Sequence, residues 1–310
     1  MARSAAWAAL VVAAILLPPA AEFFGQTYYV GFATRVLVFA LAAVALDLML
    51  GYGGMVSLGH AAFLGIGAYS VGIWSSHGVT AAPVHWATAV AAGGFFALLT
   101  GMLALRTTGV AFIMITLAFA QMLYFLAVSL KSYGGDDGLT LWESARLGPF
   151  DLGHDPTLYW VALAWLAGAF VLCRHLVASP FGLVLQAGRS NERRARALGL
   201  AVGRQRLAAY VLSGALTSVA GCLLVHATDF VSPAYMGWQR SGELVVMVIL
   251  GGIGTLTGGI LGAAALLLLE EILAGLTQHW MLILGALLVA IALVSRQGMA
   301  GLLARAWRRS

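Results

Sequence analysis

The stretch YYVGFATRVLVFALAAVALDLML, residues 28–50, decides the fold of this chain, because only two of its 23 residues carry a charge. About 20 apolar residues in an α-helix are enough to cross the hydrocarbon core of a bilayer. Similar runs recur along the sequence, in which 61% of the 310 residues are hydrophobic and 9% are charged, against about 25% charged residues in soluble domains. The sequence therefore predicts an all-α, polytopic integral membrane protein.

Candidate membrane spans follow one another along the whole chain in windows of about 20 residues. Glycines interrupt the third and the eighth, which we expect to be short or re-entrant, so we predict a single transmembrane domain, 1–310, with 8–10 helices. The first run is also compatible with a cleaved signal peptide, but we interpret it as a membrane helix because the rest of the chain is itself inserted. The predicted spans are 5–21, 28–50, 58–76, 86–105, 109–130, 157–177, 207–227, 243–257, 258–275 and 279–295.

Charge predicts the orientation of these spans. With a cytoplasmic N-terminus, Arg106, the arginine-rich loop 178–206 and the basic tail all fall on the cytoplasmic side, as the positive-inside rule requires. The loop 131–156, which holds five acidic and two basic residues, then lies outside. The net charge of +5 is therefore interpreted as a mark of membrane orientation and not of nucleic-acid binding.

The residues do not favour an enzyme. The single lysine, Lys131, does not follow a glycine-rich turn, so the chain lacks the P-loop lysine that holds nucleotide phosphates. HExxH, CxxC and GxSxG motifs are also missing from the sequence, and Cys173 and Cys222 lie within apolar runs, where a buried thiol behaves as a small hydrophobic group. We predict neither a metal nor a cofactor.

A glycine-rich stretch, GYGGMVSLGHAAFLGIGAY (51–69), follows the second span. Each glycine weakens a helix by about 1 kcal/mol relative to alanine, and irregular backbone at membrane depth is tolerated where it lines a wet cavity or is buried in protein. One interpretation is a solute pathway; the other is close packing of helices through small residues, and both can hold together. The candidate pathway residues here are Gly53, Gly54, Ser57, Gly59, His60 and Phe63, to which we add Thr116.

A second glycine-rich break, GGIGTLTGGILGA (251–263), lies near the other end of the chain. Broken helices in corresponding halves are typical of transporters with pseudo-symmetric repeats around a central route. We therefore add Gly251, Gly252 and Gly254 to the candidate pathway residues. Asp47 is expected to cap or orient the first break, Arg35 is too distant along the helix to pair with Asp47, and Glu270 and Glu271 are expected to mark the end of a span.

The loop 178–206 contains LQAGRSNERRARALGL (185–200), with four arginines and a glutamate in eight positions. Alanines favour a short helix here, Ser190 or Asn191 could serve as its N-cap, and Gly199 suits its C-terminal end. Small residues would allow a protein partner to approach closely. The alternatives are that the arginines only mark topology or contact anionic lipid headgroups.

Several motifs occur in a characteristic order. They are GYGGMVSLGHAAFLGIGAY (51–69), TTGVAFIMITLAFAQ (107–121), GGDDGL (134–139), SPFG with the R, NE, A and LG that follow it (179–199), VSP (231–233) and VILGGIGTLTGG (248–259). Together they resemble the LivM-type membrane permease subunit of high-affinity branched-chain amino acid ABC importers, over about residues 30–300.

The resemblance implies a multi-pass subunit of the bacterial inner membrane that forms the translocation pathway for branched-chain or related small amino acids. It implies a homologous permease subunit, two cytoplasmic ABC ATPase subunits and a periplasmic substrate-binding protein as partners. It also implies that a cytoplasmic helix docks on the ATPase, a coupling role that we assign to Arg189, Asn191, Glu192, Ala195, Leu198 and Gly199.

Three motifs depart from the family pattern, with RSNE at 189–192, Tyr133 before GG, and RQGM at 296–299. These departures leave the solute open, since related systems carry urea, amides or aromatic acids. A stand-alone secondary transporter or channel is the other alternative. It would need an ion-binding or proton-relay cluster, for which the sequence offers no candidate set.

Overall fold

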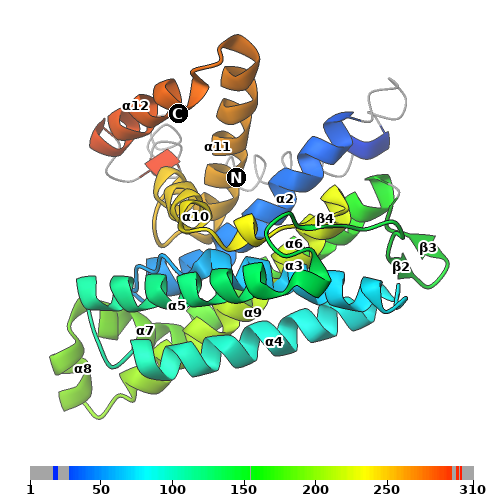
Figure 1. Cartoon of the computed structure of the whole chain (residues 1–310). Helices are drawn as coiled ribbons and strands as arrows, with labels where there is room; N and C mark the ends of the chain where they lie inside the picture. The colour runs from blue at the N-terminus through cyan, green and yellow to red at the C-terminus, as the bar shows by residue number, and fades with distance from the viewer. Residues whose placement is uncertain (1–16, 20–27, 154, 295–297, 300, 302–310) are drawn as a thin grey trace.

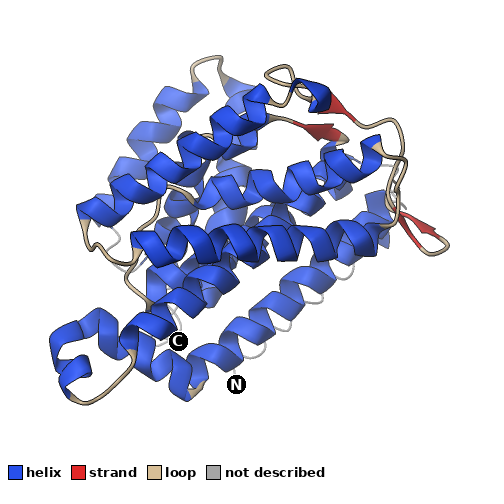
Figure 2. Cartoon of the chain, turned by 60° about the horizontal axis from the view of Figure 1, so that its bottom comes forward, coloured by secondary structure: helices blue, strands red, loops and turns tan. Residues whose placement is uncertain are grey.

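The structure is a computed structural model that describes residues 17–19, 28–153, 155–294, 298, 299 and 301. The described chain is almost entirely helical, as Figure 2 shows, and its strands are only two residues long. Nearly all of the first predicted span, 5–21, lies outside the described residues. The all-α prediction is confirmed.

Six helices of the described chain are long and apolar enough to cross a membrane. They correspond to six of the predicted spans, with bounds that differ by a few residues. The first, α2 (Tyr28–Asp47), continues into a π-helical turn (Leu48–Tyr52). The others are α4 (Ala82–Ala104), α5 (Val110–Ser129), α6 (Asp155–Ala178), α9 (Val202–Thr228) and α11 (Leu256–Leu276).

Three shorter helices complete the predicted set of spans. Helix α3 (His60–Ser76) corresponds to the third prediction, and α12 (Trp280–Val294) to the tenth. The eighth prediction, 243–257, is wrong in its bounds, because α10 runs from Trp238 to Gly251 and ends where Gly252 and Gly254 adopt φ values of +118° and +77°. The second glycine break therefore separates α10 from α11 and does not lie inside a span, since side chains rarely adopt such φ values.

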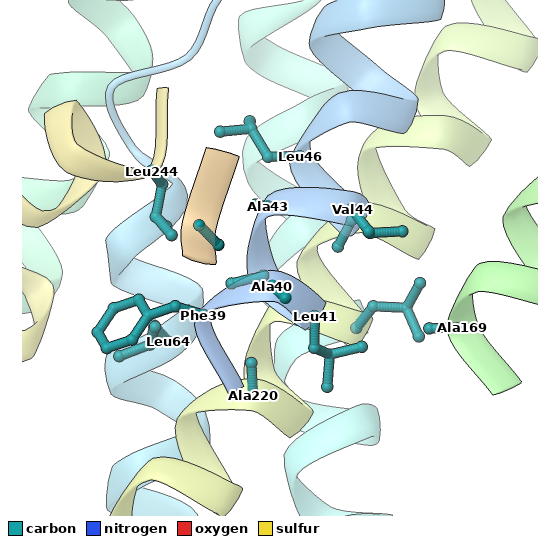
Figure 3. Packing of buried hydrophobic residues seen from close by; sticks show 14 of the residues in the cluster. Phe39, Ala40, Leu41, Ala43, Val44, Leu46, Leu64, Ala169, Ala220 and Leu244 are labelled. Carbon is teal, nitrogen blue, oxygen red and sulfur yellow. The ribbon is translucent and has the colours of Figure 1, made fainter. Parts of the chain in front are cut away.

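Helix α2 lies at the centre of the fold. Nearly every residue from Leu37 to Gly51 is buried. In Figure 3, its side chains pack against Leu64 of α3, Ala169 of α6, Ala220 of α9 and Leu244 of α10. An apolar helix that is buried on all sides has no amphipathic face, which explains why its sequence reads as a continuous hydrophobic run.

Helices α3 and α9 approach each other through small residues. A Cβ atom at Gly67 would lie 1.7 Å from the Ser218 carbonyl oxygen, and one at Gly221 would lie 1.8 Å from the Leu64 carbonyl oxygen. Small residues let helix backbones come this close in membranes. The packing interpretation of the 51–69 stretch is thus confirmed for its helical part.

Short strands and loops gather at one end of the bundle. Strand β1 (Leu139–Thr140) pairs with β4 (Phe230–Val231), and β2 (Arg146–Leu147) pairs with β3 (Phe150–Asp151). The 3-10 turns Lys131–Tyr133 and Pro233–Met236 lie in the same loops. At the opposite end, α7 (Pro180–Ser190) and α8 (Glu192–Ala197) form a helical hairpin (Figure 1). The acidic and the arginine-rich loops therefore lie at opposite ends, as their charges predict.

Candidate functional site

The hairpin of α7 and α8 is formed by local capping. Pro180 occupies the first turn of α7, where its missing N–H costs nothing. Asn191 separates the two helices, and its side-chain oxygen accepts a hydrogen bond from the Arg194 backbone N–H at 3.0 Å. Gly199 follows α8 with φ +79°. The predicted N-cap at Asn191 and the predicted role of Gly199 at the C-terminal end are confirmed, although the loop contains two short helices and not one.

Glu192 fastens this hairpin to the start of α9. Its two carboxylate oxygens lie 2.5 Å from Arg196 Nη2 and 2.5 Å from Arg206 Nη1. Arg206 also donates to the Gly188 carbonyl at 3.2 Å, so a single guanidinium joins α7, α8 and α9. The sequence did not indicate this role of Arg206, because its partners lie 14 and 18 residues away.

Five of the six predicted coupling residues divide into two groups, and Arg189, which is also exposed, differs from both. Ala195 is buried and Glu192 is half-buried, and both hold the hairpin together. Asn191, Leu198 and Gly199 are exposed, as are three arginines of α8. Leu198 is 73% exposed. The outward surface of the hairpin, which we call the coupling surface, therefore consists of Asn191, Arg193, Arg194, Arg196, Leu198 and Gly199.

Arg189 points the other way, toward the first glycine break. Its Nη1 donates a hydrogen bond to the Gly51 carbonyl oxygen, and its aliphatic stem packs against Gly54, where a Cβ atom would lie 2.9 Å from Arg189 Cγ. Gly54 has φ +68°, so this turn favours glycine for both its backbone conformation and the space that it leaves. Arg189 thereby links the hairpin directly to the end of α2.

The two glycine breaks meet at this point. Asp47 Oδ1 accepts a hydrogen bond from the Gly254 backbone N–H at 2.8 Å, and a Cβ atom at Gly51 would lie 2.5 Å from the same nitrogen. A Cβ atom at Gly254 would lie 3.5 Å from Arg189 Nη1. We call the cluster of Asp47, Gly51, Gly54, Arg189 and Gly254 the junction. Asp47 was expected to orient the first break; it binds the second break instead.

Arg35 of α2 and Glu270 of α11 form an ion pair that is separate from the junction. Glu270 and Glu271 were expected to mark the end of a span, and α11 continues past them to Leu276. Arg35 was correctly expected not to pair with Asp47, and it pairs with Glu270, at 3.8 Å between Nη2 and Oε1. The sequence could not indicate this pair, because the two residues lie 235 positions apart.

The polar residues predicted to line a pathway are packed between helices in this conformation. His60 Nε2 lies 2.6 Å from Ser213 Oγ, which in turn donates to the Ala45 carbonyl at 2.6 Å. The ring of His60 contacts Phe63 and Tyr210 edge-on. Ser57, His60, Phe63 and Thr116 are all buried. Ser213 and Ser241 were not predicted, because their partners His60 and Ala61 lie far away in the sequence. The Ser241 hydroxyl accepts a hydrogen bond from the Ala61 N–H at 2.9 Å.

The first glycine break also borders a small cavity of about 120 Å³. It lies between the turn 54–56 and the segment 105–113, beside Arg206. Gly59 packs directly against the backbone of α5, because a Cβ atom there would lie 2.4 Å from the Thr116 carbonyl oxygen. The backbone after Gly53, the start of α5 and the hairpin are therefore in contact at one end of the bundle.

The spanning helices and the broken helices that meet at the junction are typical of a membrane transport component. The sequence matches the family model described as branched-chain amino acid transport system / permease component over residues 28–292. The chain belongs to this family of membrane permeases.

Proteins with similar sequences are also named as permeases. The chain is 29% identical to the high-affinity branched-chain amino acid transport system permease protein LivM of Escherichia coli K12, over 93% of this chain and 74% of that protein. It is 28% identical to LivM of Salmonella typhimurium LT2, over 94% and 73%. It is also 31% identical to the autoinducer 2 import system permease protein LsrC of Klebsiella pneumoniae, over 86% and 76%. No solved structure matches the chain.

Proposed function

We propose that this chain is the translocating subunit of an ABC importer for branched-chain or related small amino acids in the bacterial inner membrane. It would work with a homologous permease subunit, two cytoplasmic ABC ATPase subunits and a periplasmic substrate-binding protein. Membership of the permease family and similarity to the two LivM proteins support the substrate class. The chain is also similar to LsrC, which is named as a permease for autoinducer 2 import, so the solute itself has to be measured.

The observation that carries the coupling mechanism is the hydrogen bond from Arg189 to the Gly51 carbonyl. The coupling surface would dock on an ATPase subunit, because it offers three exposed arginines together with an exposed leucine. Arginine is among the residues that most often dominate binding at protein contacts. A movement of the hairpin would then reach the junction through Arg189.

The junction is the element that would change state. Asp47 holds the start of the second break, and Gly51 lies so near Gly254 that a Cβ atom added to Gly51 would be 2.5 Å from the Gly254 nitrogen. A rearrangement here would shift α2, α10 and α11 together, and the buried residues Ser57, His60 and Thr116 would line the route once these helices separate from α3, α5 and α9. Nucleotide can drive such a change only if the ATPase binds the two states with different affinity.

The orientation of the hairpin tests this proposal. In intact cells, Leu198→Cys should resist a membrane-impermeant maleimide, and it should react in inside-out vesicles, because the side chain is largely exposed. The native Cys173 and Cys222 are buried and supply the unlabelled background. Labelling of the Leu198→Cys variant from outside intact cells would place the hairpin beyond the reach of any cytoplasmic ATPase and would refute the proposal.

Transport by the complete complex tests the substrate class. Proteoliposomes that contain this chain, its partner permease and both ATPases should take up L-leucine only with enclosed ATP and with the binding protein outside. Uptake by the purified chain alone, driven by an ion gradient, would favour a secondary transporter. Uptake of urea or an amide without uptake of any aliphatic amino acid would contradict the proposed substrate class.

A further inference from the structure

The N-terminal part of α2 and the C-terminal part of α11 extend beyond the buried core. Helix α2 is buried almost throughout from Leu37 onward, whereas Tyr28 is 63% and Tyr29 is 55% exposed. Helix α11 is largely buried up to Leu267, and exposed apolar side chains follow at Leu268, Ile272 and Leu276. The two helices touch along much of their length, so these outer parts form one half-exposed surface at the end away from the hairpin.

This surface carries matched charges. Arg35 of α2 lies 3.8 Å from Glu270 of α11, and the two side chains are 38% and 28% exposed. The hydroxyl of Tyr28 donates a hydrogen bond to the Glu271 carboxylate. We call Tyr28, Arg35, Glu270 and Glu271 the charged strip. Its ion pair is long, so the Arg35 guanidinium, with five N–H donors, has capacity for a further acceptor.

The charged strip lies within two helices that are long and apolar enough to cross a membrane. Arg35 is seven residues from the first residue of α2, and Glu270 is six residues from the last residue of α11. At 1.5 Å per residue, each charge is about 9–11 Å along a helix of spanning length. Ionisable side chains at such depths face the interior of a bundle or a water-filled cavity and mark substrate pathways, because exposure to lipid is costly.

We infer that the charged strip lines an outward-facing aqueous vestibule and binds the charged ends of a zwitterionic amino acid. Arg35 would hold the α-carboxylate, since guanidinium and carboxylate form strong charge-assisted hydrogen bonds. Glu270 and Glu271 would hold the α-ammonium group. The exposed Tyr29, Leu268 and Ile272 belong to the same outer parts of the two helices and would contact an aliphatic side chain. This inference rests on the proposed function and names the place where the solute is first held.

The competing explanation is that the ion pair only ties α2 to α11 on a surface that lipid or another subunit covers. Water access separates the two explanations, because thiol reagents of the methanethiosulfonate class attack the thiolate, which forms only in water. The matched control is Val90 of α4. It is eight residues from the first residue of its helix, it is 39% exposed, and its exposed neighbours on α4 are apolar.

The first experiment labels cysteine variants in the complete complex in intact cells. Arg35→Cys should react with a charged, membrane-impermeant methanethiosulfonate at least tenfold faster than Val90→Cys. Saturating L-leucine with the binding protein should slow the reaction of the Arg35→Cys variant and leave that of Val90→Cys unchanged. Equal rates for the two variants would overturn the inference. If Arg35→Cys does not accumulate, Glu271→Cys, which replaces an exposed residue, serves as the second site, with the same expected and contrary results.

The second experiment exchanges the charges. The double variant Arg35→Glu with Glu270→Arg keeps an ion pair but reverses its direction, so it should recover the melting temperature lost in Arg35→Ala. It should still import L-leucine at least tenfold more slowly than the unmodified complex, because the stereochemistry of the bound zwitterion no longer fits. Full recovery of import would show that the ion pair only holds α2 and α11 together and does not bind the solute. Failure of the unmodified complex to import L-leucine would instead refute the proposed function. The labelling rates of Arg35→Cys and Val90→Cys would still test whether water reaches the charged strip.

Discussion

The Asp47 carboxylate accepts a hydrogen bond from the Gly254 backbone N–H at 2.8 Å, across 207 positions of sequence. This bond ties the end of α2 to the turn between α10 and α11, so that the two glycine-rich segments act as one structural unit. Arg189 contacts the same unit from the hairpin. A chain of contacts therefore runs from the exposed coupling surface to the most buried helix of the fold.

Removal of the Asp47 side chain should loosen the junction. Asp47→Ala leaves the Gly254 N–H without its partner, and a hydrogen bond of this kind contributes about 1.5–3 kcal/mol. Asp47→Asn retains an acceptor oxygen and should lose less. We expect a lower melting temperature and at least tenfold slower L-leucine uptake in Asp47→Ala, with Asp47→Asn in between. Equal behaviour of Asp47→Ala and the unmodified chain would show that the bond does not matter.

A methyl group at Gly51 should separate the two breaks. Its Cβ would lie 2.1 Å from Asp47 Oδ1 and 2.5 Å from the Gly254 nitrogen, which is closer than nonbonded atoms approach. Gly31→Ala is the matched control on the same helix, because nothing lies within 4 Å of the added atom, and alanine favours helix by up to about 1 kcal/mol. We expect Gly51→Ala to abolish uptake and lower the melting temperature, and Gly31→Ala to do neither. Normal uptake by Gly51→Ala would argue against the junction.

Glu192 should hold the hairpin mainly through its ion pair with Arg206 and not through that with Arg196. Arg206 is 16% exposed and Arg196 is 66% exposed, and solvent-exposed ion pairs contribute little. Arg206→Gln and Glu192→Gln should therefore lower uptake per ATP hydrolysed severalfold, whereas Arg196→Gln should leave this ratio within about twofold. The measurement pairs ATPase activity with uptake in the same proteoliposomes. A large effect of Arg196→Gln with a small effect of Arg206→Gln would contradict the assignment.

The stability of the protein should depend on pH through Asp229, which lies at the loop end of the bundle. Partial burial, together with the nearby Asp151 and Asp155, raises the pKa of the Asp229 carboxyl above its usual range. The folded state then holds a proton more tightly than the unfolded state does, so stability falls as pH rises from the ordinary carboxyl pKa through the raised value.

Asp229→Asn should remove this part of the pH dependence. Asn tolerates the positive φ of this residue, +50°, as well as Asp does. We expect the melting temperature of the unmodified protein to decline more steeply than that of Asp229→Asn as the pH rises from about 4, the ordinary carboxyl pKa, through the raised pKa of Asp229. Parallel melting curves for the two proteins would exclude a role for this carboxyl.

Hydropathy predicted the six spanning helices, but not how they contact one another. The run 28–50 predicted α2 because an all-apolar helix has to be surrounded by protein or lipid, and five other spans followed for the same reason, with bounds that differ by a few residues. Glycine content predicted two breaks in the chain. It could not show that Gly51 and Gly254 meet, because contacts between distant segments leave no local pattern.

The candidate coupling residues show the same limit. Asn191 was predictable as a helix cap, since capping depends on residues three or four positions away. The inward direction of Arg189 was not predictable, because its partner, Gly51, lies 138 positions earlier. Nor could sequence show that Ser213 holds His60, or that Arg35 pairs with Glu270, since single polar residues within apolar runs do not reveal their partners.

Arg189→Ala tests the central claim most directly, because Arg189 is the residue that joins the coupling surface to the junction. The measurement is the number of L-leucine molecules imported per ATP hydrolysed by the complete complex in proteoliposomes, with Arg193→Ala, an exposed neighbour, as the control. We predict that Arg189→Ala keeps ATPase activity within about twofold and lowers the import ratio at least tenfold, while Arg193→Ala keeps the ratio. An unchanged ratio in Arg189→Ala would contradict the proposed transmission of movement from the hairpin to the glycine breaks.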